Sequence, residues 1–458
     1  MATDRRGGHP NGGSQGPAPR DIGHPLFAQP EPTADPAVFH IKHASDSKAY
    51  KEIDQLNREH KVHPLPFPAP RGGTEPRLSL TEVVGNDTSI ADAITARGQI
   101  VFQAGGDCGS TRGPEHQNEV TDKLVSDFDE SDPKEVPQFL FMLGDVVYSF
   151  GEAQYYYDQF YEPYRDYPAP ILACAGNHDG MVSPLANART LDAFLKNFCS
   201  EKFVVTPDAG GLSRTAQIQP GVFFTFEAPF VRILAFYSNT LEDPGVIANT
   251  TIGHAQLDFL EAALERVKSE NYKGALLFAH HHPPYTASSG GSRHGWSKDM
   301  LAQMDKICAK AEVWPHAVLA GHVHNYQRFT RRRPDGTEIP YVSCGNLGHN
   351  VQSLARKGSG ALRVPAAIQQ ADKNASADQV TFENYDDKNY GYLRVVVTEQ
   401  QLRIEYHAAS DGPHIKAPDD FVTVDLGSRR IGHFQATDQG QAAALKKLHA
   451  DRARLEKK

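Results

Sequence analysis

Five short apolar segments recur along the middle of the chain, and each is followed by glycine or polar residues. They are Ile100–Phe102, Phe139–Leu143, Ile171–Cys174, Ala275–Ala279 and Ala317–Ala320. Continuous apolar runs of this length are typical of strands that are buried on both faces of a sheet. Helical spacing of apolar positions separates some of them, as at Val120, Leu124 and Val125 or at Leu260, Leu264 and Val267. Strands that alternate with helices in this way predict an α/β protein.

The rest of the chain divides into segments of different texture. Residues 1–45 are rich in glycine, proline and polar residues and are predicted to form a disordered tail. Residues 46–97 are expected to pack on the core as an N-terminal extension, and residues 98–435 to form the main domain. Within that domain, residues 392–397 and 402–406 flank a short polar turn, which predicts an antiparallel hairpin. The charged, alanine-rich residues 436–458 are expected to form a helix or a tail.

Composition and charge exclude several classes of protein. With 39% hydrophobic residues the chain is too apolar to be wholly disordered, and its net charge of -9 does not predict a nucleic-acid-binding surface. Its densest basic run, Arg331–Arg333, is read as a solvated loop face. Five scattered cysteines without a CxxC spacing argue against a disulfide framework. No apolar run approaches the roughly 20 residues of a membrane span, and an apolar leader is missing, so we expect a cytoplasmic protein without membrane contact.

Candidate metal ligands follow each of the five apolar segments. Because ligands bind beyond the carboxyl ends of strands in open α/β sheets, these side chains are expected to meet in one region. The five sequences are Gly-Asp-Cys-Gly at 106–109, Gly-Asp-Val-Val-Tyr at 144–148, Gly-Asn-His-Asp at 176–179, His-His-His-Pro at 280–283 and Gly-His-Val-His at 321–324. Carboxylates bridge two cations, and imidazoles suit Zn, Fe and Mn. Two cations about 4 Å apart clamp the attacking and leaving oxygens of a phosphoryl transfer.

This ordered set of motifs resembles the calcineurin-like metallophosphoesterases, and most of all their purple acid phosphatase branch. The first motif, Asp107-Cys108-Gly109, lacks the histidine that most of those relatives have two places after the aspartate. Instead Tyr148 lies three places after Asp145, as in the purple acid phosphatases. The resemblance implies an α/β/β/α sandwich of two mixed sheets flanked by helices.

The resemblance also implies a role for each motif residue. One metal ion would take Asp107, Asp145, Tyr148 and His324 as ligands, and the other would take Asp145, Asn177, His281 and His322. Asp145 would thus bridge two divalent or mixed-valence ions of Fe, Mn or Zn. A hydroxide held by the metals would attack phosphorus in line. His178 would contact the phosphate or protonate the leaving oxygen, and Asp179 would orient His178 through its other ring nitrogen.

Two neighbouring histidines are ambiguous from the sequence. His282 follows the chosen ligand and is assigned equally to the substrate side and to simple packing. His349, in a glycine-rich loop after residues 341–343, is assigned equally to pocket lining and to a structural role.

The preferred function is a dinuclear metal-dependent phosphomonoesterase that acts on a small phosphorylated substrate. The first alternative is a phosphodiesterase on cyclic nucleotides or glycerophosphodiesters, since the same metal centre serves both reactions. The second is a non-catalytic metal-binding scaffold, against which the complete ligand set argues. The sequence leaves the natural substrate and the oligomeric state open.

Overall fold

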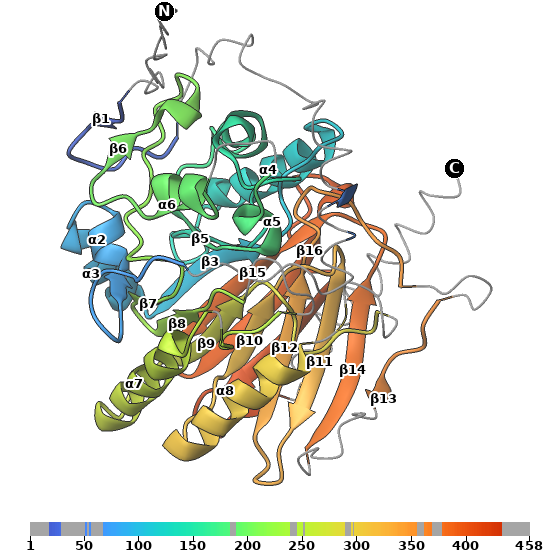
Figure 1. Cartoon of the computed structure of the whole chain (residues 1–458). Coiled ribbons are helices and arrows are strands. Elements are labelled where there is room, and N and C mark those ends of the chain that lie inside the picture. Colours follow the sequence, from blue (N-terminus) through green and yellow to red (C-terminus); the bar gives the residue numbers. More distant parts are fainter. Residues whose placement is uncertain are drawn as a thin grey trace, which may run out of the picture.

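The apolar segments form strands of two mixed β-sheets that face each other, with helices on the outer sides (Figure 1). The structure is a computed structural model, and it describes residues 18–28, 51–52, 55, 67–183, 189–238, 245–250, 252–288, 295, 297–354, 361–368 and 378–432. This arrangement confirms the predicted sandwich of two mixed sheets with flanking helices.

The seven-stranded sheet contains the first three predicted strands and the C-terminal hairpin. Its order is β18 (Arg430–Ile431), β17 (Asp420–Asp425), β16 (Gln401–Ala408), β15 (Gly391–Thr398), β3 (Gln99–Gly105), β4 (Leu140–Leu143) and β5 (Ile171–Cys174). Strands β3, β4 and β5 are parallel, whereas β15 and β16 form the predicted antiparallel hairpin.

The nine-stranded sheet contains the other two predicted strands. Its order is β13 (Ala366–Ile368), β14 (Gln379–Asp386), β11 (Tyr326–Arg332), β12 (Glu338–Cys344), β10 (Ala317–Ala320), β9 (Ala275–His280), β8 (Val231–Ala235), β7 (Phe224–Ala228) and β2 (Arg77–Ser79). Strands β8, β9, β10 and β12 run parallel to one another, so their carboxyl ends lie at one edge of the sheet.

Helices lie on the outer faces of the sheets and, in the case of the first two in the chain, against the apolar layer between the sheets. They are α2 (Leu80–Val83), α3 (Thr88–Arg97), α4 (Glu115–Ser126), α5 (Asn177–Gly180), α6 (Asp192–Phe198), α7 (Ala255–Ser269) and α8 (Lys298–Ala311). Shorter helical turns are η2 (Asp127–Asp129), η3 (Ala153–Tyr155), η4 (Tyr157–Tyr161), η5 (Pro207–Ala209) and η6 (Ala409–Asp411). Helices α7 and α8 lie side by side over the nine-stranded sheet (Figure 1). Among the described helices, none combines the length and the apolar character that a bilayer crossing requires.

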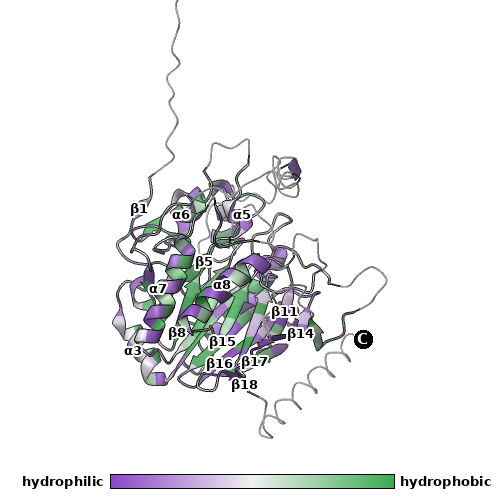
Figure 2. Ribbon diagram, turned by 60° about the horizontal axis from the view of Figure 1, so that its bottom comes forward, coloured by the Kyte–Doolittle hydropathy of each residue, from purple (hydrophilic) through white to green (hydrophobic). Residues whose placement is uncertain are grey.

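Two apolar layers hold this architecture together, because consecutive strand residues point to opposite faces. Phe141 of β4 and Leu277 of β9 belong to the layer between the sheets. Their neighbours Met142 and Phe278 belong to the layer between strands and helices. Figure 2 shows central strands such as β8 and β15 as predominantly hydrophobic and helices α7 and α8 as striped with hydrophilic and hydrophobic residues. Burial on both faces explains why these segments are continuously apolar in sequence.

The N-terminal region differs from the sequence-based domain limits. Strand β1 (Arg20–Asp21) pairs with β6 (Val204–Val205), so the prediction of a disordered tail is wrong for residues 18–28. The rest of the predicted tail, residues 1–17 and 29–45, lies outside the described residues, as do residues 436–458. Strand β2 pairs with β7 in the nine-stranded sheet. The extension therefore supplies a strand of the core in addition to packing on it.

The prediction of a solvated loop at Arg331–Arg333 is also wrong for Arg331. Arg331 belongs to β11 and is 1% exposed. Its guanidinium donates to both carboxylate oxygens of Asp305 at 2.8 and 2.6 Å and to Asp378 at 2.6 Å. A buried guanidinium needs such partners because desolvation of an unpaired charge is costly. All five cysteines are buried and free of disulfides, as expected.

Candidate metal centre

The predicted ligands lie in the loops that follow strands β3, β4, β5, β9 and β10, at the facing carboxyl edges of the two sheets. The loops are tightly bent, since four of these residues have positive φ angles: Asp107 at 59°, Asp145 at 53°, His322 at 70° and His324 at 48°. Non-glycine residues adopt this conformation rarely, and it is concentrated at functional sites. Gly176 is required by close packing, because a Cβ atom there would lie 2.1 Å from Oδ1 of Asp145.

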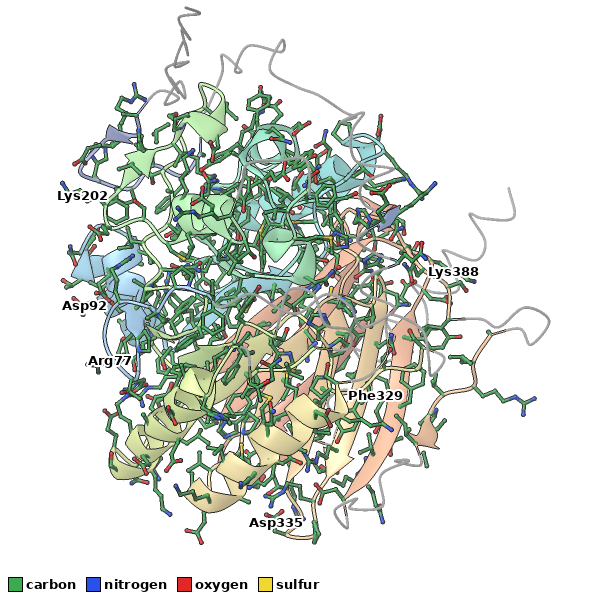
Figure 3. All side chains as sticks on the ribbon, in the orientation of Figure 1. Arg77, Asp92, Lys202, Phe329, Asp335 and Lys388 are labelled. Atoms are coloured by element: carbon green, nitrogen blue, oxygen red, sulfur yellow. The ribbon has the colours of Figure 1, made fainter. Side chains whose placement is uncertain are left out.

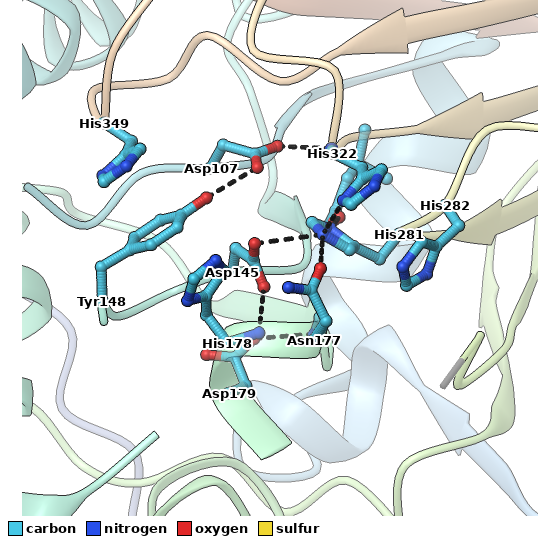
Figure 4. Close-up of polar contacts among 12 residues, drawn as sticks. Asp107, Asp145, Tyr148, Asn177, His178, Asp179, His281, His282, His322 and His349 are labelled. Atoms are coloured by element: carbon cyan, nitrogen blue, oxygen red, sulfur yellow. Dashed lines mark hydrogen bonds and ion pairs between the residues drawn. The ribbon is translucent and has the colours of Figure 1, made fainter. Parts of the chain in front are cut away.

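One group of side chains, the Asp107 cluster, consists of Asp107, Tyr148 and His324. Figure 4 labels Asp107 and Tyr148. The Tyr148 hydroxyl donates to Oδ1 of Asp107 at 2.7 Å and lies 3.4 Å from Nε2 of His324. Nε2 of His324 lies 3.1 Å from the same Asp107 oxygen. Three potential ligand atoms thus converge, and they come from three different loops.

A second group, the Asp145 cluster, consists of Asp145, Asn177, His281 and His322. Nε2 of His281 lies 3.1 Å from Oδ2 of Asp145, 3.0 Å from Oδ1 of Asn177 and 3.2 Å from Nδ1 of His322. The ligand atoms of Asp145, His281 and His322 all lie within 4.8 Å of one another. The structure therefore brings all seven predicted metal ligands into two adjacent clusters.

The two clusters are joined through their aspartates. The backbone N–H of His322, in the Asp145 cluster, donates to Oδ2 of Asp107 at 2.6 Å. Burial, Asp107 and Asp145 together raise the pKa of Tyr148 well above its ordinary value. Figure 4 shows Asp145 between Tyr148 of one cluster and His281 of the other.

The environment of His281 shows that the site fits a cation. Its Nδ1 lies 2.9 Å from the carbonyl of Leu143, which only accepts, so Nδ1 carries the hydrogen. Nε2 then faces the oxygens of Asp145 and Asn177 and Nδ1 of His322. A single N–H group on Nε2 cannot donate to all three of these atoms. Burial lowers the pKa of His281, but Asp145 and Asp107 outweigh it and raise the pKa to about 9. The cluster therefore attracts positive charge, and carboxylate, amide and imidazole donors suit Fe, Mn or Zn.

The two predicted catalytic residues have different surroundings from those expected. Nδ1 of His178 lies 2.8 Å from the carbonyl of Ser149, and its ring lies 4.3 Å from that of Tyr148. The expectation that Asp179 orients His178 is wrong. The Asp179 carboxylate instead accepts hydrogen bonds from the backbone N–H groups of Val146 at 3.0 Å, Val147 at 3.3 Å and Gly176 at 2.8 Å.

This difference has a geometric cause. Asp179 lies in the first turn of α5, directly beside the loop after β4. Its carboxylate is therefore close to three backbone N–H groups, two in the loop after β4 and one in the loop after β5. The ring of His178 points the other way, towards Tyr148 (Figure 4). Asp179 therefore fixes the backbone of the metal-binding loops, while the Ser149 carbonyl orients His178.

The other two histidines of the fourth motif lie beside the clusters. His280 ends β9 and is fully buried near Phe236, and burial lowers its pKa to about 3. Nδ1 of His282 lies 2.9 Å from Oγ of Ser238, and its ring lies 4.3 Å from that of His322. The choice of His281 as the ligand of this motif thus agrees with its position between Asp145 and Asn177.

One segment near the site was not identified from the sequence as a unit. Residues 345–352, which we call the β12 loop, follow β12 and contact both Asp107 and His324. The sequence leaves open whether His349 lines the pocket or has a structural role. In the structure its ring stacks on that of Tyr148, with ring centroids 3.6 Å apart. Asn350 was missed, although its Oδ1 is hydrogen-bonded to Nδ1 of His324. Glycines at 345 and 348 are the only sequence signal, and glycine-rich loops are common.

Comparisons with known proteins show a likeness to one family over part of the chain. Residues 106–326 match the family described as calcineurin-like phosphoesterase. "Probable purple acid phosphatase 20" of Arabidopsis thaliana is 25% identical over 191 residues, which make up 41% of this chain and 39% of that protein. The chain therefore matches well under two thirds of this curated relative.

Two solved structures show more distant likeness. The purple acid phosphatase PPD1 from yellow lupin (Lupinus luteus) seeds has a TM-score of 0.47 and 16% identity, over 71% of this chain and 54% of that one. GAP50, titled the anchor in the inner membrane complex of Plasmodium, has a TM-score of 0.45 and 13% identity, over 76% of this chain and 94% of that one. The match over residues 106–326 contains all seven predicted ligands, and over this range the chain is similar to the calcineurin-like phosphoesterases.

Proposed function

We propose that the protein is a dinuclear metal-dependent phosphomonoesterase that acts on a small phosphorylated substrate. The observation that carries this proposal is the position of Asp145 between two clusters of buried ligands, since phosphoester hydrolases of the two-metal type need adjacent cations. The Asp107 cluster would hold one cation and the Asp145 cluster the other. When bound, two such cations lower the pKa of water and neutralise charge that develops on the phosphoryl oxygens.

Backbone carbonyls of the protein supply orientation, and the side chain of His178 supplies proton transfer. Leu143 accepts from Nδ1 of His281 and thereby turns Nε2 towards the cation site, which is the usual effect of an outer hydrogen bond on a ligating histidine. The Ser149 carbonyl does the same for His178. We assign Nε2 of His178 to a phosphoryl oxygen or to the leaving oxygen, where a positioned imidazole acts as a general acid.

The experiment that tests this proposal compares two esters. The purified protein is supplied with Mn, Fe or Zn separately, and nitrophenol release is measured from nitrophenyl phosphate and from bis(nitrophenyl) phosphate. A higher kcat/KM on the monoester supports the phosphomonoesterase. A higher value on the diester favours the phosphodiesterase. Tight metal binding without turnover of either ester supports the non-catalytic scaffold.

A further inference from the structure

The β12 loop is hydrogen-bonded to two of the metal-binding loops. The backbone N–H of Leu347 donates to the carbonyl of Gly106 at 3.1 Å. The backbone N–H of His349 donates to the backbone carbonyl of Asp107 at 2.9 Å. The N–H of Gln352 donates to the carbonyl of His324 at 2.9 Å. Gly345 fits closely here, since a Cβ atom on it would lie 2.6 Å from Oδ2 of Asp107. The β12 loop therefore forms an outer wall against the Asp107 cluster.

His349 holds the ring of Tyr148 from one side. The two rings are nearly parallel, with 11° between their planes and 3.6 Å between their centroids. His349 is itself fixed, because its Nδ1 lies 2.8 Å from the carbonyl of Gly109. His178 contacts Tyr148 at 4.3 Å with an interplanar angle of 44°. Figure 4 shows Tyr148 between these two imidazoles, with its hydroxyl directed at Asp107.

Asn350, the next residue, contacts His324. Its side-chain oxygen is hydrogen-bonded to Nδ1 of His324, and Nε2 of Gln352 lies 3.2 Å from the same nitrogen. These amides occupy Nδ1, so Nε2 is the nitrogen that faces Asp107, 3.1 Å from its Oδ1. Outer hydrogen bonds of this kind fix the ring orientation of a metal-binding histidine.

We propose that His349 and Asn350 are positioning residues that set the metal affinity of the Asp107 cluster. His349 fixes the ring of Tyr148 by stacking, and Asn350 fixes the ring of His324 by its hydrogen bond. Two adjacent residues of one loop thereby orient two of the three side chains in this half of the centre. The inference rests on the proposed function, because it treats Tyr148 and His324 as ligands.

The test uses the full-length protein loaded with iron. Tyrosinate bound to a ferric ion gives a visible charge-transfer band, which reports the Tyr148 geometry without turnover. His349→Ala is expected to shift or weaken the band and to lower the affinity for the ion in this cluster by about 10- to 100-fold. His349→Phe retains a flat ring against Tyr148 and is expected to restore most of the band. Asn350→Leu, which keeps the branched side-chain shape but removes the hydrogen-bonding amide, is expected to lower iron affinity in the same range.

A matched control exists on the same protein. His116 also stacks on a tyrosine, Tyr390, with centroids 4.4 Å apart, but its side chain is largely exposed and lies outside the two clusters. His116→Ala is expected to leave the band and the iron stoichiometry unchanged. Circular dichroism and thermal unfolding of each variant separate a local change from loss of the fold.

The outcomes distinguish this inference from the proposed function. A coloured parent protein whose band and iron affinity persist in both His349→Ala and Asn350→Leu overturns the positioning roles alone. A parent protein that binds iron without a visible band overturns Tyr148 as a ligand, and the role of His349 with it. Loss of colour in His349→Ala together with recovery in His349→Phe supports the inference when circular dichroism and thermal unfolding show that His349→Ala has kept its fold.

Discussion

The Tyr148 hydroxyl donates a hydrogen bond to Oδ1 of Asp107 at 2.7 Å. Burial and the nearby carboxylates raise the pKa of this phenol well above its ordinary value, so a strongly charged cation is needed to form tyrosinate here. Tyr148→Phe removes one oxygen and is expected to abolish the visible band of the iron-loaded protein, as measured by absorption spectroscopy.

Tyr156→Phe is the matched control for this substitution. Tyr156 is fully buried like Tyr148, and among the described residues its hydroxyl has no hydrogen-bond partner. Its removal is expected to leave the band unchanged. A band that survives in Tyr148→Phe would show that another residue supplies the charge transfer.

Asp145→Asn tests the bridging position. The substitution retains the size of the side chain but removes the charge that both clusters share. We expect kcat/KM on nitrophenyl phosphate to fall by at least about 10²-fold, since a cation contributes several kcal/mol to the stabilisation of the transition state. Asp92→Asn provides the control, because Asp92 is exposed on α3, far from the site (Figure 3). Activity near that of the parent in Asp145→Asn would contradict the two-metal arrangement.

His178→Ala tests general acid catalysis. With its Nδ1 held by Ser149, His178 has a defined Nε2 direction, and its loss is expected to lower kcat by about 10²- to 10⁴-fold. The loss should be larger for an alkyl phosphate than for nitrophenyl phosphate, because an alkoxide leaving group depends more on protonation. Equal losses on both substrates would assign His178 to phosphate binding instead of proton transfer.

Asp179→Ala separates the observed role of Asp179 from the one expected from sequence. The substitution leaves three backbone N–H groups without their acceptor, and an unsatisfied buried donor costs about 1–3 kcal/mol. We therefore expect a lower melting temperature, together with activity losses that do not depend on the leaving group. A leaving-group dependence like that of His178→Ala would restore the idea that Asp179 acts through His178.

Local patterns in the sequence predicted the strands and the side chains that gather in the two clusters, because both are short-range features. The run Phe139–Leu143 is apolar since both faces of β4 are covered, and Asp145 follows it within two residues. Which of the two sheets each strand joins cannot be predicted from its own residues. The burial of Arg331 could not be predicted for the same reason, because its partners Asp305 and Asp378 lie 26 and 47 residues away along the chain.

The contact of the β12 loop with the site could not be predicted from the sequence for a related reason. The contacts of this loop with the centre are backbone hydrogen bonds, two side-chain amide contacts with His324 and one ring stack, and none of these requires a recognisable motif. His349 is 201 residues from Tyr148 in sequence (349 less 148), so their contact depends on the pairing of the strands. Residues that act on a site through other residues are thus harder to predict than the ligands themselves.

Glu405 on β16 is expected to make stability depend on acid pH. It is 7% exposed and pairs with Arg394 at 3.1 Å, Arg403 at 2.6 Å and His407 at 3.3 Å. Burial raises the pKa of Glu405, but His407 and the two arginines outweigh it and lower the pKa to about 2. Because this folded-state pKa lies below the unfolded value of about 4.3, the stabilisation is fully present above pH 5 and is lost as the pH falls towards 2.

Glu405→Gln tests this dependence by urea unfolding at pH 7, 5 and 3. At pH 7 and 5 the substitution is expected to lower the free energy of unfolding by about 2–3 kcal/mol, because two pKa units correspond to that amount. At pH 3 the difference between the proteins should be smaller, since the parent has lost part of the stabilisation. Glu399→Gln, at the exposed turn between β15 and β16, should change stability by less than about 0.5 kcal/mol at each pH. A deficit in Glu405→Gln that is as large at pH 3 as at pH 7 would show that the side chain stabilises the sheet by packing and not by its charge.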